Sequence, residues 1–138
     1  MPFMNETANT TEDSNQTQES KTDVVESKRA YAIQLFKKYS SVFLALGDEF
    51  RQKVIIELAE HPEGKNVTEI NENKTLSRPA ISYHLKVLKD CGIVTTKKKA
   101  TQVYYFLNFD DFFPKLKEFF DALFDLRRAV INAEDSED

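Results

Sequence analysis

The sequence predicts a mainly α-helical fold with one β-hairpin, and three observations lead to that prediction. Apolar residues recur at helical spacing through most of residues 24–131. Two runs, 93–96 and 102–107, are instead β-branched and aromatic, which is typical of strands. The segment before this hairpin, residues 75–92, has the pattern of a helix with one apolar and one basic face.

Length and composition indicate one folded domain with polar ends. The chain has 138 residues, is 41% hydrophobic and contains 11 phenylalanines, which is enough for a core. No run of about 18 apolar residues is present, so we expect no membrane span. The single cysteine excludes an internal disulfide, and no secretory signal precedes the domain; both favour the cytoplasm.

Charge divides the chain into three parts. Residues 1–27 hold six acids and one base, and residues 132–138 hold four acids and no base. The segment between them, 28–131, has 18 bases and 13 acids. We therefore predict a disordered acidic tail over 1–23, a basic folded domain over 24–131, and an acidic tail over 132–138.

Three helices are expected before residue 75. A broad apolar stripe predicts a long helix over 24–46. Gly47 ends it, and Asp48 caps a second helix over about 48–60. The sequence Asn66 to Glu69 resembles a capping box and opens a short third helix.

The fourth helix has marked ends and two unlike faces. Ser77 suits its N-cap, Pro79 suits its first turn, and Gly92 suits its end. One face is apolar. The other carries five residues that all donate hydrogen bonds, and none of the five is a carboxylate. Such a face suits the DNA major groove, although any solvated helix can be polar on one side. Its residues are Arg78, Ser82, Tyr83, Lys86 and Lys89.

The hairpin that follows carries three lysines, Lys97, Lys98 and Lys99, which we place with Ala100 and Thr101 at its tip. A cationic hairpin beside such a helix can contact phosphates next to the groove. Two short helices joined by a turn, followed by this hairpin, describe a winged helix-turn-helix.

The last helix, which begins near Asp110, has two apolar stripes, and a domain of this size needs only one for its core. We therefore expect the first and last helices to form a homodimer interface. The stripe that continues from Phe113 includes Phe120, Phe124 and Ile131. The residues predicted at the interface are Ala32, Phe36, Tyr39, Phe43, Phe112, Leu116, Phe119, Leu123, Leu126 and Val130.

Four segments, in order and at matching spacing, resemble the ArsR/SmtB family of winged-helix repressors. They are ALGDEFR at 45–51, LSRPAISYHLKVL at 76–88, DCGIV at 90–94 and VYY at 103–105. The family motifs that they resemble are ALGDPTR, LSQSAVSHHLKVL, DAGLV and VYY. This resemblance implies a homodimer that binds an operator near its target promoter and releases it when an inducer binds.

The chain departs from the family at the familiar metal positions. Asn66 and Thr68 stand where many members carry a pair of cysteines, and no histidine follows His84. His84 and Cys91 alone do not make a zinc site, so we predict no metal and no cofactor. An organic inducer, a redox signal through Cys91 and the absence of an inducer all stay open. His84 is expected either to pack or to contact DNA.

The resulting hypothesis is a dimeric DNA-binding regulator, favoured as a repressor, that binds an inverted-repeat operator in double-stranded DNA. A winged-helix module that binds proteins and a MarR-like regulator are the alternatives. No catalytic constellation is present, so an enzyme is not expected. The residues predicted to contact DNA are Ser77, Arg78, Pro79, Ser82, Tyr83, His84, Lys86, Lys97, Lys98, Lys99, Thr101 and Gln102.

Overall fold

The computed structural model describes the backbone of residues 3–72 and 75–135, and the side chains from residue 21 onward within those ranges. The fold is mainly helical with a small antiparallel sheet, as predicted. Two compact units are present. The first helix is α1 (Phe3–Lys38), and the last is α6 (Phe109–Asp135). The helical unit contains α1 as far as Lys37 and α6 from Lys117 onward. The core unit is Lys38–Leu116. In the described ranges, no helix is long and apolar enough to cross a membrane.

In the helical unit, α1 and α6 pack through a small set of side chains. The rings of Phe36 and Phe119 meet edge to face with centroids 4.3 Å apart. Tyr31 donates a hydrogen bond to Glu118 at 2.6 Å, which raises the pKa of the Tyr31 phenol. Lys28 faces Asp125 at 4.0 Å. Each of these three contacts joins a side chain of α1 to a side chain of α6 within the helical unit.

The two predicted tails lie largely within the backbone ranges of the first and last helices. α1 begins at Phe3, so residues 3–23, predicted as a disordered tail, continue the helix. α6 extends to Asp135 and takes in most of the predicted acidic tail, while residues 136–138 and residues 1–2 lie outside the described residues. Helical hydrogen bonds are local, so a polar segment can extend a helix that packing has already formed. The division into a central domain and two tails stays a prediction.

The long helix predicted over 24–46 is wrong at Tyr39, where the chain turns and α2 (Ser40–Leu46) begins. Neither glycine nor proline marks this position, so no local signal announces the break. Tyr39, Val42 and Ala45 are all buried, which indicates that tertiary packing of α2 decides where the helix ends.

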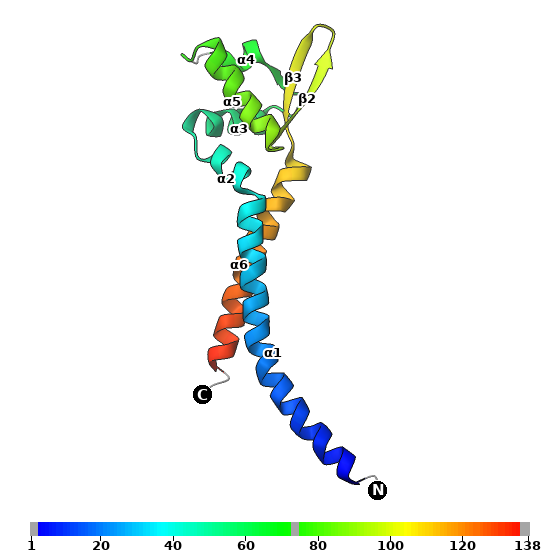
Figure 1. The fold of residues 1–138 in the computed structure, drawn as a ribbon. Helices are drawn as coiled ribbons and strands as arrows, with labels where there is room; N and C mark the ends of the chain where they lie inside the picture. The colour runs from blue at the N-terminus through cyan, green and yellow to red at the C-terminus, as the bar shows by residue number, and fades with distance from the viewer. Residues whose placement is uncertain (1–2, 73–74, 136–138) are drawn as a thin grey trace. The chain divides into compact units, whose positions relative to one another are not determined.

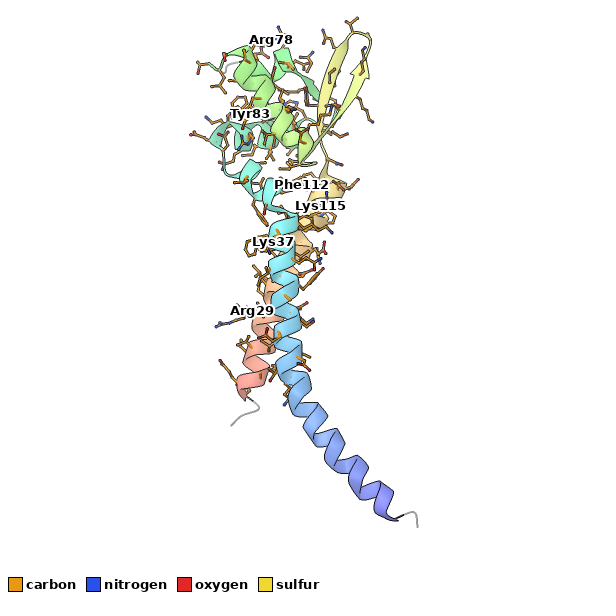
Figure 2. All side chains as sticks on the ribbon, in the orientation of Figure 1. Arg29, Lys37, Arg78, Tyr83, Phe112 and Lys115 are labelled. Atoms are coloured by element: carbon orange, nitrogen blue, oxygen red, sulfur yellow. The ribbon has the colours of Figure 1, made fainter. Side chains whose placement is uncertain are left out.

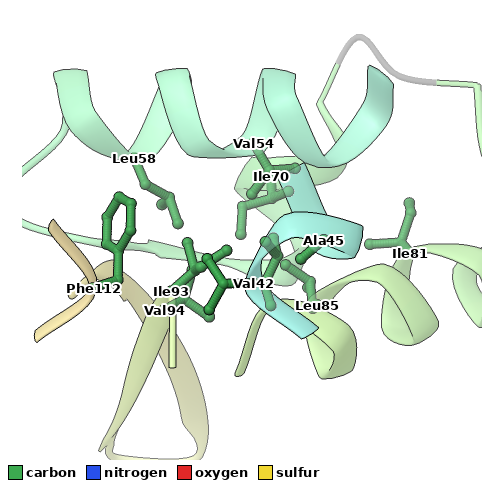
Figure 3. Packing of buried hydrophobic residues seen from close by; sticks show 11 residues of the cluster. Val42, Ala45, Val54, Leu58, Ile70, Ile81, Leu85, Ile93, Val94 and Phe112 are labelled. Carbon is green, nitrogen blue, oxygen red and sulfur yellow. The ribbon is translucent and has the colours of Figure 1, made fainter. Parts of the chain in front are cut away.

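A single hydrophobic cluster holds the core unit together. It is built from α2, α3 (Glu49–Glu60), α4 (Val67–Asn71), α5 (Arg78–Asp90), the hairpin and the start of α6, and Figure 3 shows its close packing. Val54 and Leu58 of α3 face inward, as does Ile70 of α4. The cluster positions the outer face of α5 on the surface. Its members are Val42, Ala45, Val54, Leu58, Ile70, Ile81, Leu85, Leu88, Ile93, Val94 and Phe112.

The predicted helix caps are confirmed. The side chains of Asp48, Asn66 and Ser77 accept hydrogen bonds from the backbone N–H groups three residues later, at 2.9, 2.9 and 3.4 Å. Gly92 has a φ of +85°, the left-handed conformation that ends α5 at the expected place. Local capping signals therefore predict these helix boundaries well.

The sheet is antiparallel and has the strand order β1-β3-β2. Figure 1 shows the hairpin that β2 and β3 form. β1 (Lys65–Asn66) was not predicted, because two residues carry no periodic signal. β2 (Val94–Lys99) extends through the three lysines and pairs with β3 (Gln102–Leu107). The prediction that Lys97, Lys98 and Lys99 form the tip is therefore wrong. The turn is Ala100–Thr101, and Ala100 has a φ of +55°, a left-handed conformation that glycine adopts more readily than other residues.

Candidate DNA-binding surface

The basic face of α5 is exposed along its length. Ile81, Leu85 and Leu88 anchor the opposite face in the core, so rotation of the helix is restricted. Arg78 lies in the first turn of α5, and Tyr83 lies further along the same helix (Figure 2). Tyr83 is 61% exposed although it is aromatic. Such a surface presents a guanidinium, hydroxyls and an ammonium to one partner. The predicted contact residues that are exposed on or before α5 are Ser77, Arg78, Pro79, Ser82, Tyr83 and Lys86.

The wing lysines divide between the two faces of the hairpin. Neighbouring residues of a strand point to opposite faces, so Lys97 and Lys99 share one face and Lys98 lies on the other. Lys97 stands over the ring of Phe106 at 5.4 Å, and Lys99 over that of Tyr104 at 5.1 Å. Cation–π contacts hold these two ammonium groups against the sheet. Thr101 and Gln102 are also exposed, beside the turn.

A hydrogen bond joins the wing to the helix-turn-helix. Asn66 donates from Nδ2 to Oε1 of Gln102 at 2.5 Å, while its Oδ1 caps α4. One side chain thereby connects the tip of the hairpin to the start of α4. Sequence reasoning missed this contact, because 36 residues separate the two partners.

His84 lies on the inner side of α5. Its side chain is only 16% exposed, and its ring lies 5.0 Å from that of Phe50. The Nη1 atom of Arg51 is 3.0 Å from His84 Nδ1. The sequence leaves two roles open for His84, packing or contact with DNA. This half-buried position against Phe50 agrees with packing. Arg51 was not among the predicted site residues, although it belongs to the 45–51 motif.

Asp48 completes this cluster. Its Oδ1 accepts the Arg51 N–H at 2.9 Å and lies 3.7 Å from His84 Nδ1. The backbone N–H of Arg51 is the main cause that lowers the pKa of the Asp48 carboxyl; burial opposes this effect, and the positive charge of Arg51 adds to it. Asp48 therefore stays ionised at neutral pH.

Burial separates the residues predicted for a dimer interface. Ala32, Tyr39, Phe112 and Phe119 are buried within their own chain, whereas Phe36 is 50% exposed. Phe43, Leu116, Leu123, Leu126 and Val130 are half-buried. The other stripe of α6 is the exposed one. Its members are Phe113, Phe120, Phe124 and Ile131, at 54%, 52%, 67% and 42% exposure.

Comparison with known proteins places this geometry in a family. The family model described as "Bacterial regulatory protein, arsR family" matches residues 48–96, from the start of α3 into the wing. The arsenical resistance operon repressor of Bacillus subtilis (strain 168) is 37% identical over 76 residues, which cover 54% of this chain and 70% of the repressor. The chain belongs to the ArsR family of bacterial regulatory proteins.

Other similar proteins agree. The transcriptional repressor SdpR of the same strain is 34% identical, with coverage of 50% of this chain and 74% of SdpR. An ArsR-like transcriptional regulator from Rhodococcus sp. RHA1 superposes with a TM-score of 0.61 at 26% identity, over 77% of this chain and 97% of that chain. This ArsR-family chain is thus a DNA-binding transcriptional regulator with the winged-helix fold, which sets the MarR-like alternative aside. The family consists of regulators and not of enzymes.

The metal positions familiar in the ArsR family hold different chemistry here. Asn66 uses both of its amide atoms in hydrogen bonds, and Thr68 is exposed. Among the side chains described, those of residues 21–72 and 75–135, no three His, Cys, Asp or Glu groups lie close enough together to hold a metal ion. Cys91 donates from Sγ to the carbonyl of Leu88 at 3.5 Å, and burial raises the pKa of its thiol. A raised pKa makes the thiolate scarce and the thiol slow to oxidise.

Proposed function

We propose that this protein is a homodimeric repressor that binds a specific inverted-repeat operator. The observation that carries the proposal is that one unit holds both the exposed donor side chains of α5 (Arg78, Ser82, Tyr83 and Lys86) and a wing that bears three lysines. The names of the two similar Bacillus subtilis repressors support repression as the outcome of binding.

In this proposal α5 enters the major groove. The guanidinium of Arg78 suits a bidentate contact with guanine, and the hydroxyls of Ser82 and Tyr83 suit either base edges or phosphates. Lys86 and the wing lysines contact the phosphate backbone, which adds affinity without sequence preference. Lys98 lies on the face of the hairpin opposite to Lys97 and Lys99, whose ammonium groups stand over aromatic rings, so we assign to Lys98 a phosphate on that face.

Dimerisation uses the exposed stripe of α6. Water-exposed aromatic side chains repeated along one helix gain free energy when a second copy covers them, at about 25 cal/mol per Å² of apolar surface. A two-fold dimer presents two α5 helices, and hence two half-sites about one helical turn apart on the DNA.

Release from DNA follows a signal other than a metal at the familiar positions. Asn66 and Thr68 supply no thiolate, and the last helix supplies no histidine. An organic inducer is consistent with this donor set, and the ArsR family resemblance supplies the expectation that an inducer exists.

The deciding experiment is selection of bound fragments from the host genome, followed by gel shifts of the retained fragments and sedimentation of the complex. We expect an inverted repeat that binds two chains at physiological salt. If no fragment shifts even at low salt, the operator proposal fails and a winged-helix module that binds proteins takes its place. If one chain binds a single site with full affinity, the dimer proposal fails.

A further inference from the structure

Arg51 connects three segments of the core unit through one guanidinium group. Its Nε donates to the carbonyl of Ala45 at 2.9 Å, and its Nη2 donates to that of Leu44 at 3.1 Å. Both carbonyls lie in the last turn of α2, where backbone acceptors lack the partner four residues later that a helix interior supplies. The carbonyl of Leu44 also accepts the N–H of Gly47 at 3.2 Å. The third arm, Nη1, reaches His84 on α5 at 3.0 Å.

The contact with Arg51 determines the protonation state of His84 that fits this geometry. Arginine is a cation with only donor groups, so Nδ1 of His84 must accept the hydrogen bond. An imidazole that accepts at Nδ1 is neutral and carries its proton on Nε2. The ring is held on its other sides by Phe50 and by the neighbouring Tyr83, with centroids 5.0 and 5.5 Å away.

We propose that Arg51 is a positioning residue for the DNA-reading helix, and that it acts through neutral His84. The guanidinium is held by α2 and in turn sets the orientation of α5, although neither Arg51 nor His84 touches a base. The inference rests on the proposed role of α5 in the major groove and goes beyond it, because it makes operator affinity depend on a proton.

Protonation of His84 reverses its interactions. Nδ1 becomes a donor that faces the guanidinium of Arg51, and two cations then stand where a hydrogen bond was. The charged groups that face the ring are Arg51 and, at 3.7 Å, the carboxylate of Asp48. Tyr83 is the titratable neighbour on α5 itself. The imidazolium is pushed from Arg51 toward Asp48, which shifts the helix segment that carries Ser82 and Tyr83.

The experiment compares the duplex retained in the genomic selection with a random duplex of equal length. Anisotropy titrations run from about pH 8 to about pH 5.5, the range in which histidines change charge. For the wild type, we expect the preference for the selected duplex to fall as the pH falls. His84→Asn places an amide oxygen at the same bond separation as Nδ1, so it should keep the preference and lose the pH dependence.

Two further variants sharpen the test. Arg51→Lys keeps the positive charge but cannot donate to Ala45, Leu44 and His84 at the same time. The preference for the selected duplex should therefore fall about tenfold at pH 8, which corresponds to the loss of one charge-assisted hydrogen bond. His61→Asn removes the only other histidine, which pairs with Glu63 in a surface turn, and should behave as wild type.

Each outcome bears on the proposal. A pH dependence that survives in His84→Asn overturns it, as does an unchanged preference in a folded Arg51→Lys. If circular dichroism shows that Arg51→Lys is unfolded, the paired histidine variants decide alone. A wild type that binds both duplexes equally at pH 8 contradicts the operator proposal instead, and leaves the Arg51 contacts to be judged by thermal stability.

Discussion

At the scale of single residues, the conformation and contacts of each side chain decide what it can do. Arg78 on α5 and Arg51 on α3 are both arginines, but Arg78 is exposed. The three guanidinium nitrogens of Arg51 instead contact Leu44, Ala45 and His84. The two glycines Gly47 and Gly64 differ as much. Gly64 has a φ of +84°, whereas Gly47 has an ordinary helical φ of −83°.

Replacing Arg78 by alanine should relax sequence preference. A bidentate arginine contact with guanine discriminates against other bases by about 1–3 kcal/mol, and this difference disappears with the guanidinium. Competition between the operator and single-base variants measures it. Arg29→Ala, on α1 of the helical unit, is the matched control and should leave the discrimination unchanged.

Replacing Gly64 by alanine should destabilise the protein by about 1–3 kcal/mol. The new Cβ would lie 2.6 Å from the ring of Phe106, at a φ that side chains rarely adopt. Gly47→Ala meets no atom closer than 3.5 Å at a helical φ and should be neutral or slightly stabilising. Urea unfolding of both variants tests the contrast, and equal midpoints would contradict it.

At the scale of elements, local signals determine where helices begin, and long-range contacts determine the geometry of the wing. Caps at Asp48, Asn66 and Ser77 mark three helix starts, and they are visible in the sequence because a cap and its partner are three residues apart. The wing is an element whose charge is predictable but whose geometry is not. The sequence places its lysines at the tip, whereas pairing with Gln102 and Tyr104 draws them into β2.

Replacing the three wing lysines by glutamine should weaken all DNA alike and flatten the salt dependence. Each phosphate contact contributes about one unit to the slope of log K against log salt, so the slope should fall by up to about three. The control is Lys117→Gln, which removes an α6 cation paired with Asp121 at 2.8 Å. An unchanged slope in the triple variant would exclude the wing from the DNA contact.

The start of α3 should be sensitive to acid. The backbone N–H of Arg51 lowers the pKa of Asp48 in the folded state. Its contribution to stability is therefore present above the unfolded-state pKa and is lost as the pH falls through the folded-state value. Between about pH 5 and about pH 2, the wild type should lose more stability than Asp48→Asn, which keeps a cap but has no charge. Asp90→Asn, an exposed carboxylate of α5, serves as the control in urea unfolding.

At the scale of the whole molecule, the operator binding that we propose uses two chains. In this proposal, a second copy covers the exposed apolar stripe of α6. The sequence shows two stripes on this helix without saying which is buried. The structure buries Phe112 and Phe119 and leaves Phe120 and Phe124 in water.

Replacing Phe120 and Phe124 together by glutamate should give a folded monomer with weak operator binding. Burying an unpaired charge in an apolar interface costs several kcal/mol, so the carboxylates should favour the separated chains. Ile56→Glu changes a side chain of α3 that is 60% exposed and should remain dimeric. Sedimentation equilibrium measures the mass, and a dimeric double variant would contradict this use of the stripe.

The sequence by itself determined the helices and strands that carry local signals, the basic face of α5, the cationic wing and the family. These features follow from periodicity, capping and motif spacing, all of which act over a few residues. Tertiary structure alone decided the break at Tyr39, the strand at Lys65–Asn66, the bond from Asn66 to Gln102 and the contact of Arg51 with His84. Each of these depends on which distant segments pack together, and packing energy is not written in any short stretch of the chain.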